Sequence, residues 1–488
     1  MADLKHKTVA GMIWSAIQKF GVMGISFVSN MVLARLLSAD EMGCIGLLAI
    51  FILLSNTFID GGFGSALIQK KQPTQSDYST IFWWNMGLSV VLYGVLFLAA
   101  PWVAAFYKMD ILCDVLRVQG LVLIFNALCL IQNNQLRKKL KFKLLATTNI
   151  AAAVVSVVVA IVLAYMGWGV WSLVAQQLVL SIMGALLLWI VGRWRPSFVF
   201  SVSSFKELFH FGFFILLSNL INTFCNNIQG LLIGRIYNPA TMGYYSQARK
   251  LEQVSSNSLS QIVDQVAYPV LAEAQNDKAY MQNILKKLIT SLAFVVFPLM
   301  MVMALTARPL IVLIYSAKWL PAVPYFQILC IAGTASCLQG LNYYAVAAVG
   351  KSGSLFRWTL LKRLCGLVFV VGGLWLWGMT GLLSGMVMTS FFIYLVNAYL
   401  VEQFVGYGVL RQLKDLVPVT LLTLAAFAVG YLVQVPLSEC GMFLRGGVAF
   451  VAFVIVYLGV AKVFRIEAMA EALMLLGQVK NKFTKNRK

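Results

Sequence analysis

Charged residues are scarce in this chain, and so are the residues that build metal or redox centres. Asp, Glu, Lys and Arg make up 11% of the 488 residues, whereas 60% are apolar. A chain with so little polar surface cannot cover itself in water, which excludes a soluble globular protein. With two histidines, and eight cysteines that form no CxxC pair, the sequence offers no metal or redox motif, and no cofactor is expected.

Long polar connections are also missing. Apolar runs of about 20 residues, the length that crosses about 30 Å of hydrocarbon as a helix, follow one another through the chain. The stretches between them are far shorter than the roughly 50 residues that a soluble domain needs. A membrane glycosyltransferase or polymerase would usually need a catalytic domain outside the lipid. The sequence therefore favours a transporter and not an enzyme.

The positive charge is placed where it orients a membrane protein. If the chain crosses the membrane fourteen times, 28 of its 38 Lys and Arg fall on the side of the termini, seven fall on the other side, and three lie within spans. Basic residues accumulate on the cytoplasmic side of membrane proteins. We predict an all-α polytopic protein of about fourteen transmembrane helices with both termini in the cytoplasm. The net charge of +21 is explained by topology and not by nucleic-acid binding.

The chain contains an internal repeat. Three short patterns recur in the same order at offsets of 200, 208 and 209 residues: Arg35, Met42 and Gly43 as Arg235, Met242 and Gly243; Pro101 and Tyr107 as Pro309 and Tyr315; Trp168 and Gly169 as Trp377 and Gly378. Because each repeat holds an even number of helices, six, both halves have the same orientation in the membrane. We predict two pseudo-symmetric six-helix lobes, two added helices and a basic cytoplasmic tail, over 1–200, 201–403, 404–465 and 466–488.

Two predicted spans, 207–236 and 243–272, are unusually polar. Steps of four, four and three residues place one set of side chains on a single face of the first span: Ser218, Asn222, Asn226 and Gln229. The second span carries Arg249, Lys250, Glu252, Gln253, Asn257, Gln261 and Asp264. An ionised group near the bilayer centre costs roughly 2.5 to 3.5 kcal/mol, so these side chains indicate a cavity lined by water or protein.

Several stretches resemble a known family. The turn 34–43, the run 60–69 and the stretches 242–249 and 268–271 are similar to those of Wzx-type lipid-linked oligosaccharide flippases. These belong to the polysaccharide transporter family of the multidrug/oligosaccharidyl-lipid/polysaccharide exporter superfamily. The likeness covers nearly the whole chain and is greatest to exporters of the capsule, teichuronic or colanic-acid type.

The resemblance implies a V-shaped pair of six-helix lobes around a central, often cationic cavity that opens alternately to the cytoplasm and the outside. It implies an undecaprenyl-diphosphate-linked oligosaccharide as cargo and the bacterial inner (plasma) membrane as location. Membrane lipid and a glycan polymerase are the expected partners, nucleic acid is not, and the protein is expected to be a monomer. A peptidoglycan lipid-precursor flippase and a drug/cation antiporter of the same superfamily are the alternatives.

Cationic side chains within the spans suit the diphosphate of such a cargo, and amides and hydroxyls suit its sugars. We predict that Lys19, Arg249 and Lys250 bind the diphosphate, together with a polar set formed by Ser218, Asn222, Asn226, Gln229, Gln253, Asn257 and Gln261. A structural interpretation stays open for both groups. Arg249 and Lys250 lie only about 9 Å along the helix from Gly243 and can reach the outer interface. The amides can instead bond to a neighbouring helix.

Three acidic residues are candidates for ion coupling. Asp264 shares the polar stripe and lies deeper than the interface, so it can exchange a proton or help to hold Na⁺, or instead serve as a structural partner to a cation. Glu252 accompanies the cations on the same span and can pair with Arg249. Asp60 stands beside two glycines and is more typical of a residue that caps or packs a bend.

Overall fold

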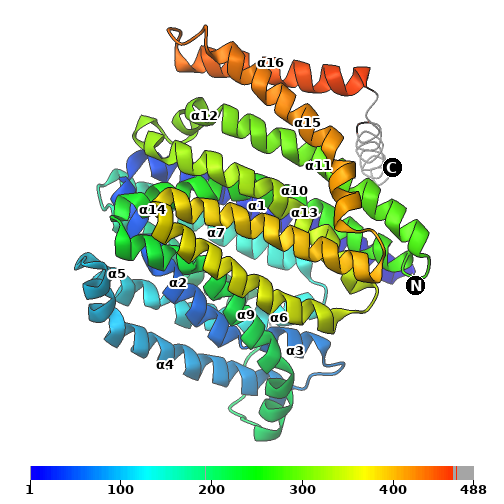
Figure 1. Ribbon diagram of the computed structural model, residues 1–488. Helices are drawn as coiled ribbons and strands as arrows, with labels where there is room; N and C mark the ends of the chain where they lie inside the picture. The colour runs from blue at the N-terminus through cyan, green and yellow to red at the C-terminus, as the bar shows by residue number, and fades with distance from the viewer. Residues whose placement is uncertain (1, 193, 465–468, 470–488) are drawn as a thin grey trace. The chain divides into compact units, whose positions relative to one another are not determined.

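The computed structural model describes residues 2–192, 194–464 and 469, with the side chains of 2–10, 12, 257, 259, 261–266, 352 and 356 outside that description. The predicted basic tail, 466–488, therefore lies outside the described residues apart from 469. The elements (Figure 1) are α1 (Ala2–Leu36), α2 (Ala39–Asp60), α3 (Phe63–Gln69), α4 (Gln75–Tyr107), α5 (Ile111–Gly120), α6 (Val122–Lys138), α7 (Phe142–Tyr165), α8 (Val170–Val191), α9 (Val202–Ile236), α10 (Pro239–Glu273), α11 (Lys278–Leu305), α12 (Ala307–Ile314), η1 (Ala317–Ala322), α13 (Val323–Ala348), α14 (Ser352–Phe404), α15 (Val409–Gln434) and α16 (Met442–Val463).

The number of membrane helices agrees with the predicted fold. Within the described residues, twelve helical segments are long and apolar enough to cross a membrane, and α10, with its many polar residues, is not one of them. The 53-residue α14 is counted once, although Trp377 and Gly378 leave helical geometry in its middle. With α10 and both halves of α14, the described residues form fourteen membrane-length helices. The predicted all-α polytopic fold is confirmed.

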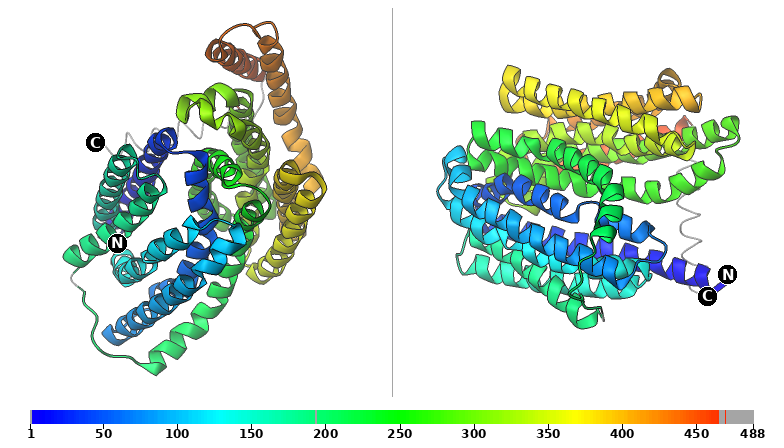
Figure 2. Two further views of the ribbon diagram at one scale, coloured as in Figure 1. Left: turned by 90° about the vertical axis from the view of Figure 1, so that its left-hand side faces the viewer. Right: turned by 90° about the horizontal axis from the view of Figure 1, so that it is seen from below.

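The chain divides into two compact units, one up to Ser246 and one from Gln247. In the first unit α7 packs between α1 and α8, and α9 packs on α2, α3 and α4. In the second unit α13 packs on α11 and α14, while α15 packs on α11 and α16. The axes of most long helices within each unit are roughly aligned, as the two views in Figure 2 show. The predicted boundaries at 200, 403 and 465 stay predictions.

The backbone supports the repeat that the sequence indicates. Gly169 has φ 53° and ψ −128°, and Gly378, 209 residues later, has φ 59° and ψ −137°. Both values lie in a region that only glycine adopts readily. Lys108 and Ser316, which follow the repeated tyrosines at an offset of 208, also have positive φ, 57° and 113°. Each repeat therefore leaves helical geometry at the same places, with the same conformation at Gly169 and Gly378 and with positive φ at Lys108 and Ser316.

The first matched turn brings the two repeats into contact within the first unit. Gly43 lies against the backbone of Pro239, and Gly243 lies against the backbone of Ala39, so closely that a Cβ on either glycine would overlap the other helix. Ala39 and Pro239 are themselves 200 residues apart. The contact is therefore self-complementary, as expected for two elements related by a two-fold axis. Glycine at both positions lets the first turns of α2 and α10 touch.

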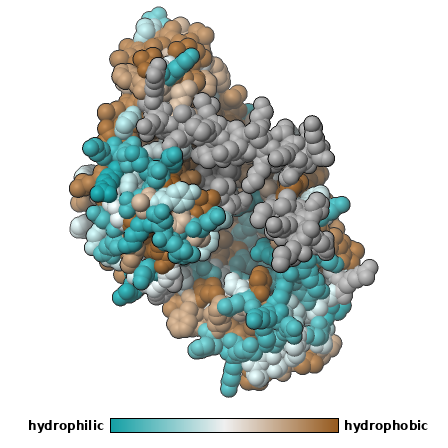
Figure 3. Space-filling model, turned by 90° about the vertical axis from the view of Figure 1, so that its right-hand side faces the viewer, coloured by the Kyte–Doolittle hydropathy of each residue, from teal (hydrophilic) through white to brown (hydrophobic). Residues whose placement is uncertain are grey.

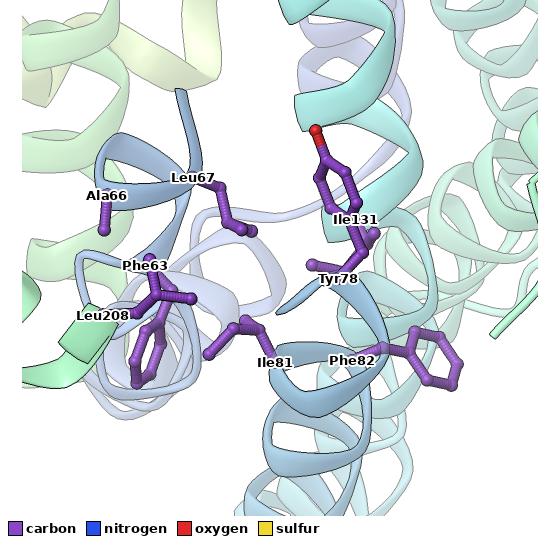
Figure 4. Packing of buried hydrophobic residues seen from close by; sticks show 8 residues of the cluster. All are labelled: Phe63, Ala66, Leu67, Tyr78, Ile81, Phe82, Ile131 and Leu208. Atoms are coloured by element: carbon purple, nitrogen blue, oxygen red, sulfur yellow. The ribbon is translucent and has the colours of Figure 1, made fainter. Parts of the chain in front are cut away.

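A break between α2 and α3 forms the bend expected beside Asp60. Gly61 and Gly62 have φ values of 55° and 72°, which ends α2 and redirects the chain into α3. Directly after them, Phe63 is 1% exposed and lies in a buried cluster that joins α3, α4, α6 and α9 (Figure 4). The members of this cluster are Phe63, Ala66, Leu67, Tyr78, Ile81, Phe82, Ile131 and Leu208. This packing holds α9 in the first unit.

Hydrophilic residues gather on the face of the molecule seen in Figure 3, with hydrophobic residues around them. Large apolar side chains are exposed along many helices, among them Leu98, Trp102, Ile190, Phe214 and Trp375. Apolar surface on the outside of a helical protein is what lipid requires, because hydrocarbon cannot hydrate polar groups. The distribution fits a chain that spans a membrane.

Candidate functional site

A cavity of about 930 Å³ lies within the first unit, between α1, α2, α6, α7 and α8. Its volume is near the upper end of the range for ligand pockets, about 300–1,000 Å³. All five helices are candidate membrane spans, yet nearly half of the lining is polar: Ser15, Gln18, Lys19, Asn56, Asn126, Asn133, Arg137, Asn149, Gln177 and Ser181. Polar side chains at membrane depth favour a cavity that holds water or a polar ligand.

Two cations line this cavity. Lys19 lies in the middle of α1, about 26 Å from the start of the helix at 1.5 Å per residue, and its side chain is exposed. Arg137 lies in the last turn of α6, is also exposed, and interacts electrostatically with Asp60 at the end of α2. Asp60 is half-buried, with one carboxylate oxygen beside Gly64. The cavity thus carries net positive charge with a carboxylate at its margin.

Amide pairs hold the cavity wall together. Asn126 Nδ2 donates to Asn56 Oδ1 at 3.1 Å, which joins α6 to α2. Gln119 Nε2 donates to Gln177 Oε1 at 2.6 Å, which joins α5 to α8. Interhelical amide bonds of this kind contribute about 0.6 kcal/mol each in membranes. They position the wall while Asn133 and Asn149 add further hydrogen-bonding groups to the lining.

The predicted stripe on α9 varies in exposure along the helix. Ser218 and Asn222 are half-buried and Asn226 is exposed, whereas Gln229 is 6% exposed. Gln229 lies where α9 packs on α2, next to Gly230, whose position approaches the backbone of Gly46. The described lining of the cavity contains Lys19 but none of these four side chains. Their predicted role in substrate binding stays a prediction.

The cations of α10 differ in exposure. Arg249 is half-buried and Lys250 has an exposed side chain, and Gln253, one turn on, is half-buried. The side chains of the three deeper predicted residues, Asn257, Gln261 and Asp264, lie outside the described part of the chain, although the α10 backbone passes through them. The structure does not test their predicted roles.

Glu252 is buried in α10. It is 6% exposed, its carboxylate bonds to Ser256, and one carboxylate oxygen lies beside Gly333 of α13. The positive charge of Arg249, on the preceding turn, interacts favourably with the carboxylate of Glu252. Glu252 therefore faces the interior of the second unit and links α10 to α13. Among the residues that the structure describes, no three His, Cys, Asp or Glu side chains are grouped to hold a metal ion.

Sequence reasoning missed most of the cavity lining. Arg137 belongs to a run of basic residues after an apolar stretch, a pattern typical of residues that orient a membrane protein, yet it lies within α6 and lines the cavity. Asn126, Asn133 and Arg137 follow one another at seven and four residues, a helical spacing that places them on one face. That spacing is the signal in the sequence that indicates them.

Residues 32–324 match the profile of a family described as polysaccharide biosynthesis protein. The match spans more than half of the chain. The chain belongs to this family. Membership confirms the predicted resemblance to polysaccharide exporters.

Curated relatives of this family member carry names from polysaccharide assembly. The chain is 27% identical over 360 residues to the teichuronic acid biosynthesis protein TuaB of Bacillus subtilis, covering 73% of this chain and 74% of the relative. It is 25% identical over 399 residues to the lipopolysaccharide biosynthesis protein WzxC of Escherichia coli, covering 80% and 79%. A third relative, 24% identical over 72% of this chain and 71% of its own length, is the succinoglycan biosynthesis transport protein ExoT of Rhizobium meliloti.

Solved structures show that the fold of this family member is shared more widely. The lipid II flippase MurJ in an inward closed conformation superposes with a TM-score of 0.73 at 13% identity, over 93% of this chain and 99% of that one. An inward-facing multidrug transporter of the MATE family gives a TM-score of 0.58 at 13% identity, over 84% and 98%. At such identities the likeness concerns the fold alone.

Proposed function

We propose that this protein is a flippase that moves a polyprenyl-diphosphate-linked oligosaccharide across the bacterial inner membrane by alternating access, with both termini in the cytoplasm. Family membership and the polysaccharide-assembly names of the relatives support a polysaccharide precursor as cargo. The observation that carries the proposal is the cavity of the first unit, with Lys19 and Arg137 on its wall.

The chemistry of the lining suits the headgroup of such a cargo. A guanidinium grips two phosphate oxygens at once and an ammonium acts as a compact point charge, so Arg137 and Lys19 complement a diphosphate. Amides both donate and accept hydrogen bonds, which matches sugar hydroxyls. The polyprenyl tail is apolar and stays in lipid, so no free energy is needed to move it into a polar environment. The cavity would thus offer a polar route to the headgroup alone.

The polar residues of α9 and α10 extend this proposal. Arg249 and Lys250 would meet the diphosphate at a later stage, and the amides and hydroxyls around them would meet the sugars. Asp264, Glu252 and Asp60 are the carboxylates that would couple transport to an ion gradient. The burial of Glu252 and the proximity of Asp60 to Arg137 support the proposal that these two carboxylates bind and release the coupling ion.

Removing both cavity cations tests the proposal. In a strain that depends on this gene for surface glycan, Lys19→Gln with Arg137→Gln should lower export at least about 100-fold, because each charge-assisted hydrogen bond contributes about 1.5–3 kcal/mol. The lipid-linked intermediate should accumulate on the cytoplasmic leaflet while protein abundance stays normal. Surface glycan and extracted lipid-linked sugars measure the two effects.

A matched control removes the same charge elsewhere. Lys139→Gln with Lys141→Gln changes two exposed lysines in the turn between α6 and α7, outside the cavity lining, and should leave export near the level of the unchanged protein. Normal surface glycan in the cavity variant would refute the assignment of the cavity to the cargo. The chemistry of the accumulated lipid identifies the glycan, and accumulation of a peptidoglycan precursor would point to the alternative flippase.

A further inference from the structure

A second cavity lies wholly within the second unit, at one end of three packed helices. It measures about 800 Å³ and lies between the first half of α11, the stretch 414–425 of α15 and the end of α16. One part of its lining is polar, formed by Asn283, Lys286, Lys287, Thr290, Lys414 and Asp415. The rest is apolar, and includes Pro418, Leu421, Ala425, Val460 and Phe464. We call this space the α11–α15–α16 pocket.

The lysines of the pocket lie at the depth of lipid phosphates. Lys286 and Lys287 are followed by the apolar run 288–305, whose 18 residues span about 27 Å, close to the roughly 30 Å of the hydrocarbon layer. Lys414 and Asp415 stand at the same transition on α15, since no charged residue follows them up to its end at Gln434. The ammonium groups of both helices therefore lie at the level where a leaflet carries its phosphates.

The pocket carries a net positive charge. It contains three lysines and one aspartate, which leaves two positive charges in excess. The aspartate is already bonded twice, because Asp415 pairs with Lys286 at 3.0 Å and accepts a hydrogen bond from Tyr407 at 2.8 Å. Burial raises the pKa of Tyr407, so this phenol stays protonated and donates. Lys287 and Lys414 both have exposed side chains.

The polar end of the pocket is held rigidly. Gln412, one turn before Asp415, is fully buried and exchanges two hydrogen bonds with Asn342 of α13, at 3.0 and 3.1 Å. The hydroxyl of Tyr394 on α14 donates to the same amide oxygen at 3.0 Å. This buried network fixes the first turns of α15 to the helices of the second unit. The lysines are therefore presented from a fixed frame.

The apolar wall indicates what the ligand is attached to. Leu421 and Ala425 are exposed and lie about two and three turns beyond Lys414 on α15, and the exposed Phe464 directly follows the last turn of α16. A free phosphate would make no use of this wall, whereas an acyl chain below a phosphate would cover it. We propose that the α11–α15–α16 pocket binds an anionic phospholipid, with Lys287 and Lys414 on the phosphate and the acyl chains against the apolar wall. This inference does not depend on the proposed transport function.

Native mass spectrometry of the purified full-length protein tests the site with phosphatidylglycerol as the anionic probe and phosphatidylethanolamine as the comparison. The unchanged protein should retain phosphatidylglycerol in preference. Lys287→Gln with Lys414→Gln should weaken retention about 25-fold, because each lysine contributes about fivefold at an anionic lipid surface. Lys286 stays unchanged so that its pair with Asp415 is kept.

Two further variants make the test specific. Lys139→Gln with Lys141→Gln removes two exposed lysines outside the pocket and should retain the lipid at the unchanged level. Ala425→Trp narrows the apolar wall at an exposed position and should weaken retention of long-chain phosphatidylglycerol without affecting the short-chain dihexanoyl form. Each protein is first checked for a single symmetric size-exclusion peak.

Three outcomes would overturn the proposal. Equal loss in both lysine variants would show diffuse attraction to any basic surface. Unchanged binding in Lys287→Gln with Lys414→Gln would exclude the pocket. Displacement of bound phosphatidylglycerol by millimolar inorganic phosphate would show a free-anion site in which the apolar wall has no part.

Discussion

Lys362 is a charged residue held inside the protein. It lies in α14, is 5% exposed, and donates to Asn397 Oδ1 at 2.7 Å. Asn397 Nδ2 in turn donates to the Gln339 carbonyl of α13 at 3.2 Å. Within the described residues, no salt bridge involves Lys362. Since a buried ammonium is costly unless its hydrogen bonds are satisfied, the amide of Asn397 is what stabilises it.

We predict that Asn397→Leu destabilises the second unit more than Lys362→Met does. Loss of a hydrogen bond to a charged group costs about 1.5–3 kcal/mol of unfolding free energy, and Asn397→Leu leaves the ammonium buried without its acceptor. Lys362→Met removes the charge together with the need to satisfy it. The double variant should therefore be more stable than Asn397→Leu alone. Thermal unfolding in detergent measures all three, and equal losses in both single variants would contradict the coupling.

Individual charged residues were only partly predictable. Lys19 could be identified because it stands alone in a long apolar run. Arg137 and Lys362 could not, because each adjoins another basic residue, and clustered positive charge normally marks the cytoplasmic side. Whether such a residue faces lipid headgroups or the protein interior depends on which helix packs against it. Helix packing is a property of the tertiary structure, and the spacing of residues in the sequence says little about it.

At the scale of elements, the crossing of α2 and α10 depends on two glycines. We predict that Gly43→Ala and Gly243→Ala each destabilise the protein, because the added methyl group overlaps the facing backbone and overpacking costs about 1–3 kcal/mol. Gly87→Ala is the matched control, since nothing lies within 4 Å of a Cβ at that position of α4. It should be neutral or stabilising, because alanine is favoured over glycine within helices by about 0.5–1 kcal/mol.

The sign of the change in melting temperature distinguishes a close helix crossing from helix propensity as the cause. If the crossing is as close as described, melting temperature falls for the two crossing glycines and rises or stays constant for Gly87→Ala. The same sign in all three variants would mean that helix propensity alone decides the outcome and that α2 and α10 do not touch at these positions. Thermal unfolding in one detergent is sufficient for the comparison.

Element boundaries followed well from the sequence where glycine determines them. The bend at Gly61 and Gly62 was expected, and Trp377 and Gly378 form one of the repeated patterns. At both places the glycines take conformations with positive φ. The break between α5 and α6 was not expected. Gly120 ends α5, but Leu121 after it keeps helical backbone angles, so no left-handed residue marks the break. Glycine gives access to positive φ by its own chemistry, so a turn that needs positive φ can be located from the sequence.

At the scale of the molecule, the fold class and the duplication could be predicted, but the grouping of helices could not. Apolar length determines the spans, and repeated turn residues reveal the repeat, because both properties are local. The packing of α9 on α2, α3 and α4 is not local: it depends on the cluster around Phe63 and on Gly62 meeting the backbone of Gly212. Periodicity places residues on a face of a helix without saying which helix covers that face.

The number of membrane crossings determines on which side of the membrane each loop lies. Labelling of a native cysteine can show the side of one loop. Cys440 is exposed in the loop between α15 and α16. If α10 crosses the membrane and α14 crosses it twice, fourteen crossings place this loop outside when the N-terminus is cytoplasmic. We predict that a membrane-impermeant maleimide labels Cys440 in intact spheroplasts and that Cys440→Ser abolishes this labelling.

A second position is needed for the test. If α10 did not cross and α14 crossed only once, the two errors in the number of crossings would leave Cys440 on the predicted side. In a Cys440→Ser background, Asp277→Cys places a thiol in the turn between α10 and α11, which fourteen crossings put in the cytoplasm. It should react only after the membrane is permeabilised. Labelling at this position in intact spheroplasts would mean that α10 does not cross. Protection of both Cys440 and the thiol of Asp277→Cys would mean that α14 is a single span, which would place the lysines of α15 on a different side from those of α11.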